Sequence, residues 1–407
     1  MVMVKRLAPF VGINNVSDED ALQIEGKSPK LYVKDAVNVD LSISGKIALR
    51  KGSAQVTAHN FKNLWQSPLH KDVFATLEHQ IVKVDPISWD YEVLKRNIND
   101  SIVCYEIVNN LIFISTLDGI FIFNGTLLEP LAIATPTSPM ASTNPQGGRL
   151  GGGEYTLAIA YMRNGIESGL SDHVKCKINL DGNGDLLQGS LSLTLPYCID
   201  ESVTHVVVYA TSRNGAELKK YQAYPITTYQ VNIDQVDDLG RAAQFSGLSP
   251  MPSGKFMKYW QGRLLTADKN VLRFSQSMAY HLHDERHDFV MLPQRITFVE
   301  PVDNGIWIGQ VDHVVFLSGL EPKAMQFVKK TAHAPIPNTA VELDADSVGS
   351  EISQGGAKTV LWLAENGYVL GTSSGQVIEL HAGVLKGISA KSGRCVGLGR
   401  RITTIVS

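Results

Sequence analysis

The sequence predicts an all-β fold: a β-propeller-like body that is interrupted near its middle by an inserted β-sandwich. Short apolar or β-branched runs bounded by Gly, Asn, Asp or Pro recur along the whole chain, for example over 72–77 and 80–85, whereas helical periodicity is nearly absent. The chain has 407 residues, which is too long for one ordinary core. We therefore expect two domains, or one large repeat-built domain that carries an insertion.

The clearest strand pattern lies in residues 109–129. Apolar runs are separated there by Asp118-Gly119 and by Asn124-Gly125, dipeptides that are typical of hairpin turns. Similar patterns return over 305–317 and 360–380. Antiparallel meanders that repeat roughly every 40 residues are typical of propeller blades.

Changes in composition mark the insertion. Residues 135–153 are rich in Pro, Ser, Thr and Gly, a composition typical of linkers, and longer alternating strands begin at Glu154. A second linker, 249–254, precedes the return of the meander pattern. We therefore predict an N-terminal arm with the first part of the propeller, then an inserted sandwich, then the second part of the propeller. These parts span residues 1–135, 150–247 and 255–407.

Composition excludes several classes of protein. Hydrophobic residues make up 44% of the chain and charged residues 19%, which excludes general disorder. The net charge of -3 argues against tight binding of nucleic acid, which needs clustered Lys and Arg. No run approaches the ~18 apolar residues of a membrane span, and no apolar signal region follows the N-terminus. We expect a protein that is made and kept in an aqueous compartment.

The four cysteines are expected to be buried free thiols. Cys104, Cys176, Cys198 and Cys395 are scattered without a CxxC pair, so they indicate neither a zinc ribbon nor a disulfide framework. Free cysteine is often found in protein cores.

The richest polar cluster contains His281, His283 and His287 together with Asp284 and Asp288. Imidazoles and carboxylates are ligands for zinc and similar metals, and His281 and His283 would share a face of an extended segment. The spacing does not match a helical HExxH motif. A solvated loop or interface patch is the favoured interpretation, and a metal site is the alternative.

Other candidate sites also have simpler interpretations. Asp181–Asp185 lacks the glycine and glutamate positions of an EF-hand and is read as a hairpin loop, and Gly147–Gly153 lacks the Gly-Lys-Ser/Thr of a phosphate-binding loop. No GxSxG motif is present. We therefore expect no enzyme, and we predict no catalytic, cofactor-binding or metal-binding residue and no cofactor.

Four tryptophans lie inside strand patterns and are predicted to pack in the core: Trp65, Trp260, Trp307 and Trp362.

Several short phrases along the chain, beginning with Phe10–Asn15, Glu154–Tyr161 and Tyr259–Leu264, together resemble the tail nozzle or hub proteins of short-tailed bacteriophages. The phrases that match the lead into that family's first blade are Phe10–Asn15, Tyr32–Asp40, Ser44–Lys46 and Arg50–Gly52. Those similar to fibronectin-III-like modules of phage structural proteins are Glu154–Tyr161, Gly165–Ser168 and Val206–Tyr209. Those that match the return to the propeller are Tyr259–Leu264 and Val271–Ser275, and those that match the strands that follow in the family are Ile306–Ile308 and Val314–Leu320.

The resemblance implies a structural virion protein of the tail, a β-propeller with an inserted fibronectin-III-like or immunoglobulin-like module. It implies a homo-oligomeric ring, expected to be a hexamer, that contacts a portal-side adaptor or neck protein and other tail proteins such as the tip or fibre. Such a ring extends the portal channel and conducts DNA during ejection, with transient non-specific DNA contact. A strongly positive duct would retain DNA, so the near-neutral charge fits this role. The expected location is the host cytoplasm during assembly and then the virion.

A glycan-binding or glycan-cleaving propeller is the alternative function. Propellers host both activities, and phage tails meet bacterial polysaccharides. A glycosidase needs two carboxyl groups that face each other across a cleft, a geometry that the sequence neither shows nor excludes.

Overall fold

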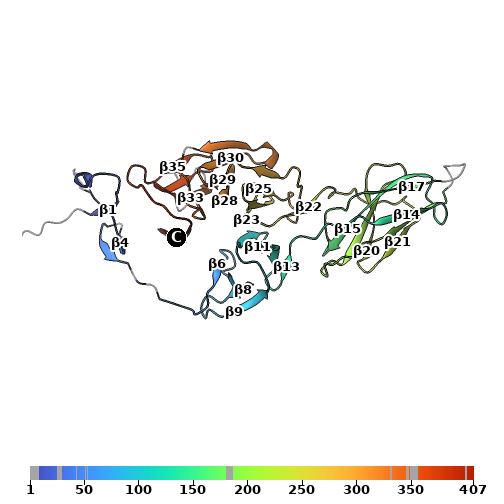
Figure 1. Ribbon diagram of the computed structural model, residues 1–407, viewed down its shortest axis with the longest axis horizontal. Helices are drawn as coiled ribbons and strands as arrows, with labels where there is room; N and C mark the ends of the chain where they lie inside the picture. The colour runs from blue at the N-terminus through green and yellow to red at the C-terminus, as the bar shows by residue number, and fades with distance from the viewer. Residues whose placement is uncertain are drawn as a thin grey trace, which may run out of the picture.

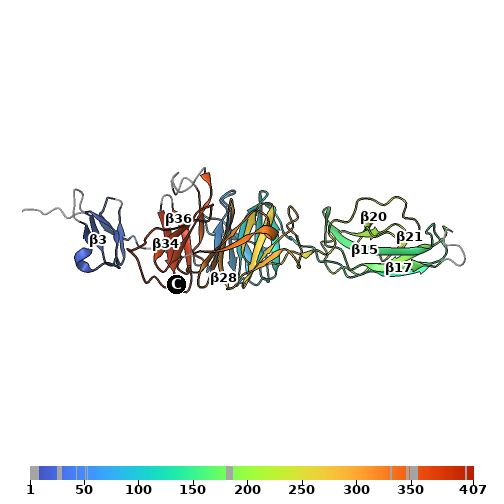
Figure 2. The same cartoon turned by 90° about the horizontal axis from the view of Figure 1, so that it is seen from above.

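A computed structural model shows that the chain is all-β, a β-propeller with an inserted β-sandwich, which confirms the predicted fold class. Three units follow one another along the long axis: small N-terminal sheets, the propeller body and the sandwich (Figures 1 and 2). The structure describes all residues except 1–8, 25–29, 43, 51, 53, 180–186, 331, 345–347, 349–355 and 399–400. The predicted hairpin loop at Asp181–Asp185 therefore lies outside the described residues.

The propeller body contains five four-stranded antiparallel sheets, here called blades 1 to 5. Blade 1 comprises β6 (Lys62–Gln66), β7 (Val73–Leu77), β8 (Gln80–Val84) and β9 (Tyr91–Lys95). Blade 2 comprises β10 (Cys104–Val108), β11 (Leu111–Thr116), β12 (Gly119–Phe123) and β13 (Leu128–Pro130). Blade 3 comprises β23 (Lys255–Trp260), β24 (Arg263–Asp268), β25 (Val271–Phe274) and β27 (Phe289–Met291).

Blades 4 and 5 follow directly in the chain. Blade 4 comprises β28 (Ile296–Val302), β29 (Gly305–Gln310), β30 (Val314–Ser318) and β31 (Gln326–Lys330), with the 3-10 helix η2 (Pro322–Ala324) before its last strand. Blade 5 comprises β32 (Val341–Leu343), β33 (Thr359–Ala364), β34 (Gly367–Gly371) and β35 (Val377–Glu379). In every blade the first strand in the chain lies at one edge of the sheet and the last at the other.

Each inner blade buries both of its faces. On β11, Ile112 and Ile114 pack with Phe74 of blade 1, whereas Phe113 points to the other side and meets Tyr280 of the blade 3 region with ring centroids 6.1 Å apart. A strand that is buried on both faces needs apolar residues at successive positions. This explains the continuous apolar run that the sequence shows at 111–114.

Blades 4 and 5 pack through two tryptophans. Trp307 and Trp362 are fully buried, with ring centroids 5.5 Å apart, and Phe298 lies 5.5 Å from Trp362. The Trp307 Nε1 donates to the carbonyl oxygen of Thr372 at 2.9 Å. A Cβ atom at Gly371 would lie 2.6 Å from Trp307, so this blade contact requires glycine. The core prediction is confirmed for these two tryptophans and for Trp260, which is also buried, whereas Trp65 is only partly buried.

Replacing Trp362 should destabilise the propeller. Trp362→Ala removes the ring from a closely packed interface, and we expect the free energy of unfolding to fall by about 3–5 kcal/mol. The measurement is the midpoint of chemical denaturation followed by circular dichroism. Tyr197→Ala is the control, because Tyr197 is 89% exposed, and it should change stability by less than about 0.5 kcal/mol. Equal midpoints for the two variants would contradict this packing argument.

The N-terminal unit, residues 10–49, forms sheets of its own. It contains β1 (Phe10–Ile13), η1 (Glu19–Ala21), β2 (Gln23–Ile24), β3 (Lys30–Val33), β4 (Val39–Leu41) and β5 (Ile47–Leu49). The sheet orders are β1-β3-β2 and β4-β5. The phrases matched to a lead into the first blade therefore stand apart from blade 1, because their short strands pair with one another and not with β6.

The N-terminal unit is attached to the segment that follows blade 5. Asn15 donates from its backbone nitrogen to Val384 O at 3.0 Å and from Nδ2 to Lys386 O at 2.9 Å, and its Oδ1 accepts from the Lys386 nitrogen at 2.9 Å. The two bonds with Lys386 join positions that are 371 residues apart in the chain. The unit thus projects from the body beside blade 5 (Figure 1).

The chain after blade 5 forms a hairpin of β36 (Gly393–Leu398) and β37 (Arg401–Val406). The hairpin is fixed to blade 5: Tyr368 Oη lies 2.7 Å from Thr404 Oγ1, and the nitrogen of Gly393 donates to Pro337 O at 2.9 Å.

The sandwich is inserted between blades 2 and 3. One sheet contains β14 (Met140–Asn144), β18 (Ser190–Thr194) and β21 (Gln230–Ile233). The other contains β15 (Gly153–Arg163), β16 (Ile166–Glu167), β17 (Val174–Ile178), β19 (His205–Ala210) and β20 (Lys219–Pro225). Their facing apolar side chains, among them Leu157, Leu191 and Val208, form one core. The sandwich begins at Met140 rather than at 150, because β14, hidden in the Ser- and Thr-rich stretch, pairs with β18.

Two chain crossings join the sandwich to the propeller. On the outgoing side, buried Arg163 donates to the carbonyl oxygens of Pro130 and, at 3.3 Å, of Leu131. On the return side, His281 Nε2 lies 2.9 Å from the carbonyl oxygen of Glu167. The short strand β22 (Ser249–Pro250) also pairs with β26 (Leu282–His283).

Candidate binding site at the propeller axis

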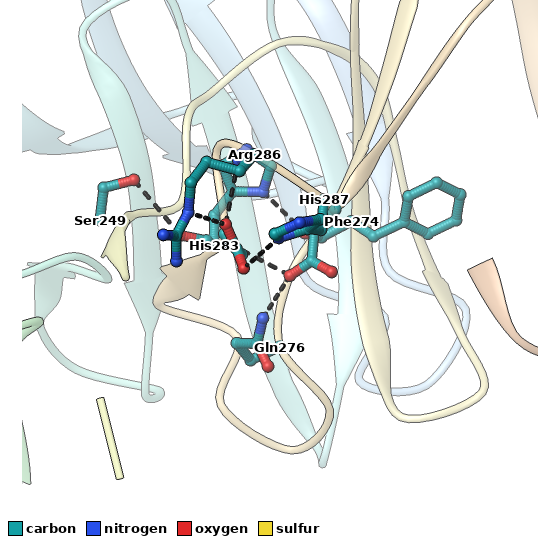
Figure 3. A network of polar contacts seen from close by, with 8 residues as sticks. Ser249, Phe274, Gln276, His283, Arg286 and His287 are labelled. Carbon is teal, nitrogen blue, oxygen red and sulfur yellow. Dashed lines mark hydrogen bonds and ion pairs between the residues drawn. The ribbon is translucent and has the colours of Figure 1, made fainter. Parts of the chain in front are cut away.

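Two members of the histidine cluster, His283 and His287, lie in a network of polar contacts near the sandwich joint (Figure 3). His283 is buried and its Nδ1 lies 2.9 Å from the carbonyl oxygen of Phe274. His287 Nδ1 lies 2.9 Å from Asp284 Oδ2 at the exposed side of the loop. His281 turns away to the sandwich, as described above. The three imidazoles therefore have three different partners and do not converge.

The carboxylates of the same loop serve its own backbone and side chains. Asp288 is buried and accepts hydrogen bonds from Gln276 Nε2 and from the nitrogen of Asp284. Asp284 also accepts from the nitrogen of Arg286 at 3.0 Å. In the part of the chain that the structure describes, no group of three or more His, Cys, Asp or Glu side chains is placed to hold a metal ion. The predicted solvated loop applies only in part, because His283 and Asp288 are buried whereas His287 is exposed.

The remaining candidates from the sequence lie apart from one another. All four cysteines are free: Cys176 is buried, and Cys104, Cys198 and Cys395 are half-buried. The glycine-rich segment Gly147–Gly153 connects β14 to β15 inside the sandwich, where Leu150 forms a bridge with Gly189. Its backbone is thus part of the sandwich rather than a free linker.

A polar site that the sequence analysis missed lies at the propeller axis. The strands or adjoining residues at the start of all five blades line a cavity of about 230 Å³, and Arg394 of β36 contributes to it. A second cavity, of about 360 Å³, lies next to the first and shares Lys258 with it. The second cavity is lined by charged and aromatic side chains that include Glu106, Trp260, Glu342 and Lys358.

Two ion pairs organise the charge at this axis. Lys258 Nζ of β23 lies 2.7 Å from Glu300 Oε2 of β28, and the Glu300 side chain is almost fully buried. Lys358 Nζ lies 2.7 Å from Glu342 Oε1 of β32. Glu106 of β10 lines the second cavity together with Glu342, whereas Glu300 lines the first. Four blades thus contribute one charged residue each to the axis from the first strands of their sheets.

Burial and charge together shift the pKa values of this group. Burial raises the pKa of Glu106 to about 7, against the opposing attraction of Lys258 and with a further rise from Glu300. Burial also raises the pKa of Glu300, again opposed by Lys258. For Lys258, burial opposes the charged form, but Glu300 and Glu106 outweigh it and raise the pKa. Lys258 is therefore charged at neutral pH, and Glu106 changes its protonation near pH 7.

The protonation of Glu106 should make stability depend on pH. Because its pKa is raised from 4.5 to about 7 by folding, its contribution favours the folded state below pH 4.5 and is lost as pH rises through 7. Glu106→Gln mimics the neutral form, so this variant should be more stable than the wild type above pH 7, by about 1–3 kcal/mol. The two proteins should have equal stability near pH 4.5.

The measurement for Glu106 is urea denaturation between pH 4.5 and 8. Glu129→Gln is the matched control, because Glu129 is an exposed carboxylate at the outer strand of the same blade. The control should follow the wild type at every pH. A difference between Glu106→Gln and the wild type that does not change with pH would contradict the assignment.

The cavity also contains donors without a partner in the protein. Among the described residues, Tyr105 Oη at the first cavity and Trp260 Nε1 at the second are buried and make no hydrogen bond. Buried polar groups are nearly always paired in folded proteins, so unpaired donors beside a polar cavity favour binding of a small polar group. The sequence signal for this site is a single charged residue near the centre of an apolar first strand, as at Glu106 and Glu300.

No protein-family model matches the chain, and no curated protein matches it. Among solved structures, BBS1N in complex with ARL6DN is similar with a TM-score of 0.33 and 10% identity, over 86% of this chain and 90% of that chain. The AfRom2 CNH domain gives a TM-score of 0.28 and 9% identity, over 86% and 91%. Apo AztD from Citrobacter koseri gives 0.27 and 12%, over 80% and 88%. Scores this low carry no functional argument, and the blades themselves define the propeller.

No helix in the described part of the chain is long and apolar enough to cross a membrane.

Proposed function

We propose that the chain is a structural subunit of a bacteriophage tail, a nozzle or hub protein that assembles into a ring and extends the portal channel for DNA. The propeller and its inserted sandwich support the proposal, because the sequence resemblance implies that combination. The subunit acts by shape and surface contact, without catalysis. Its place is the host cytoplasm during assembly and then the virion tail, beside a portal-side adaptor and other tail proteins.

Exposed apolar side chains are the observation that carries this proposal. Tyr197, Ile199 and Tyr229 of the sandwich are strongly exposed, and the nitrogen of Leu195 donates to Tyr229 O, which brings their two loops together. Large exposed apolar residues that gather in one place mark contact surfaces. The net charge of -3 also supports only transient DNA contact.

The location of the chain in purified virions tests the proposed function. We expect a reconstruction of the particle to contain a ring of this chain on the tail axis, and mass spectrometry of isolated tails to detect it. A virion without the chain in its tail would contradict the proposal. Tyr197→Ser combined with Tyr229→Ser should reduce incorporation of the folded chain into tails, because it removes both exposed rings.

Glycan binding or cleavage is the second candidate function, and the axial cavity favours it. Trp260 and Tyr259 lie there beside the carboxyl groups of Glu106 and Glu342, a combination of aromatic and acidic groups suited to a polar ring ligand. The purified chain on a glycan array, and incubated with bacterial capsular polysaccharide, provides the test. Binding that falls at least tenfold in Glu342→Gln and persists in Glu129→Gln would support this candidate, and no binding or cleavage would contradict it.

A further inference from the structure

The charges that line the first axial cavity leave one cation without a partner. Lys258 and Arg394 are the cationic side chains of this cavity, and Glu300 is its carboxyl group. Lys258 is already paired, because its Nζ lies 2.7 Å from Glu300 Oε2. Arg394 is exposed on β36, and its guanidinium makes no ion pair or hydrogen bond with the residues that the structure describes. The charge of Arg394 is therefore available to a ligand.

Tyr105 brings an unused hydrogen-bond donor to the same cavity. Its Oη atom is buried and has no hydrogen-bond partner among the described residues, whereas its ring stacks on Trp65 with centroids 5.1 Å apart and planes 4° apart. A buried hydroxyl without a partner carries a free-energy cost that a bound acceptor would remove. The stacked ring fixes the position of this hydroxyl.

The Tyr105 hydroxyl is protonated at neutral pH and lies within range of the Arg394 charge. Burial raises the pKa of Tyr105, the neighbouring Cys104 adds to the rise, and Arg394 opposes it. Arg394 also opposes the rise that burial causes in the pKa of Cys104. The unused donor and the unpaired cation thus act on one region of the cavity, a combination that suits an oxyanion.

Much of the remaining wall is apolar. Side chains of blades 1, 3 and 4 contribute to it, among them Leu64, Trp65, Phe256 and Phe298. The cavity has a volume of about 230 Å³, whereas a single water molecule needs only about 10–15 Å³ of such space. A ligand with an apolar part as well as an oxyanion would use both kinds of wall.

We propose that the first axial cavity binds a small organic acid. The carboxylate accepts a hydrogen bond from Tyr105 Oη and pairs with Arg394, and the apolar part lies against the aromatic wall. An amine is disfavoured because Glu300, the carboxyl group of this cavity, is already paired with Lys258. The site is separate from the second cavity, to which glycan binding is assigned above, and it does not rest on the proposed tail function.

Three probes of the same shape and different charge test the ligand class. Benzoate is an anion, benzamide is neutral and benzamidine is a cation. Ligand-detected NMR titrations of the purified full chain at equal ionic strength measure their dissociation constants. Benzoate should bind at least tenfold more tightly than either of the others. No measurable binding of benzoate, or tighter binding of benzamide or benzamidine, would overturn the proposal.

Acetate and inorganic phosphate separate an organic acid from a bare oxyanion. Both carry the charge that Arg394 attracts, but neither has a ring that covers the apolar wall. Each should therefore bind at least tenfold more weakly than benzoate. Phosphate that binds as tightly as benzoate would contradict the organic-acid assignment.

Tyr105→Phe tests the hydroxyl while the stacked ring is kept. This variant should bind benzoate at least tenfold more weakly, because it lacks a hydrogen bond to a charged group. Without ligand, its urea denaturation midpoint should be equal to or higher than that of the wild type, because an unpartnered hydroxyl is removed.

Tyr155→Phe is the matched control, because the buried Tyr155 Oη donates to the carbonyl oxygen of Gly151 at 2.9 Å. This control should lower the denaturation midpoint and leave benzoate binding unchanged. A midpoint for Tyr105→Phe as low as that of Tyr155→Phe would show that the Tyr105 hydroxyl already has a partner, and it would overturn the proposal.

Arg394→Gln tests the charge, and it should weaken benzoate binding at least tenfold and benzamide binding much less. Arg96→Gln is its control, because Arg96 is an exposed arginine that follows the outer strand of blade 1, and it should bind benzoate like the wild type. Lys258 is left unchanged, because its removal would leave Glu300 buried without a partner. Equal benzoate affinity in Arg394→Gln and Arg96→Gln would overturn the proposal, whatever the location of the chain in virions.

Discussion

The packing of apolar blade faces against one another is the constraint on which the rest of the structure depends. A four-stranded sheet with apolar side chains on both faces cannot bury them alone, so each blade needs a neighbour on either side. Ile112 and Phe113 illustrate this, since adjacent residues of one strand serve two different interfaces. Between blades 4 and 5, Trp307 and Trp362 pack against each other and fill the interface. The blades therefore arrange themselves around an axis, and the cavities lie along that axis.

Local patterns allowed the meanders and the insertion to be predicted, but not the pairing between distant strands. The turn at Asn124 was visible because its side chain accepts hydrogen bonds from the following backbone nitrogens, a purely local interaction. Strand β14 was missed because Ser and Thr at 142–143 hide its alternation and its partner β18 lies about 50 residues away. The separate sheets of residues 10–49 were missed for the same reason, since pairing of β1 with β3 is set by tertiary contacts.

The two polar clusters show why closeness in sequence is a poor guide to a site. His281, His283 and His287 are neighbours in the chain, yet their imidazoles reach three separate partners. Glu106 and Lys258 are far apart in the chain, yet they meet because first strands of different blades converge on the axis. A single charge inside an apolar strand is easily read as a surface position. The circular order of the blades is what brings such charged residues from different first strands together.

The double attachment of the sandwich has a mechanical consequence. A domain joined by one linker swivels freely, but this one leaves the body at Pro130 and returns at Ser249, with Arg163 and His281 bracing the two crossings. Rotation of the sandwich about one crossing is therefore opposed by the other crossing. We therefore expect the sandwich to keep a fixed orientation relative to the propeller. A force on the sandwich would be transmitted to blades 2 and 3.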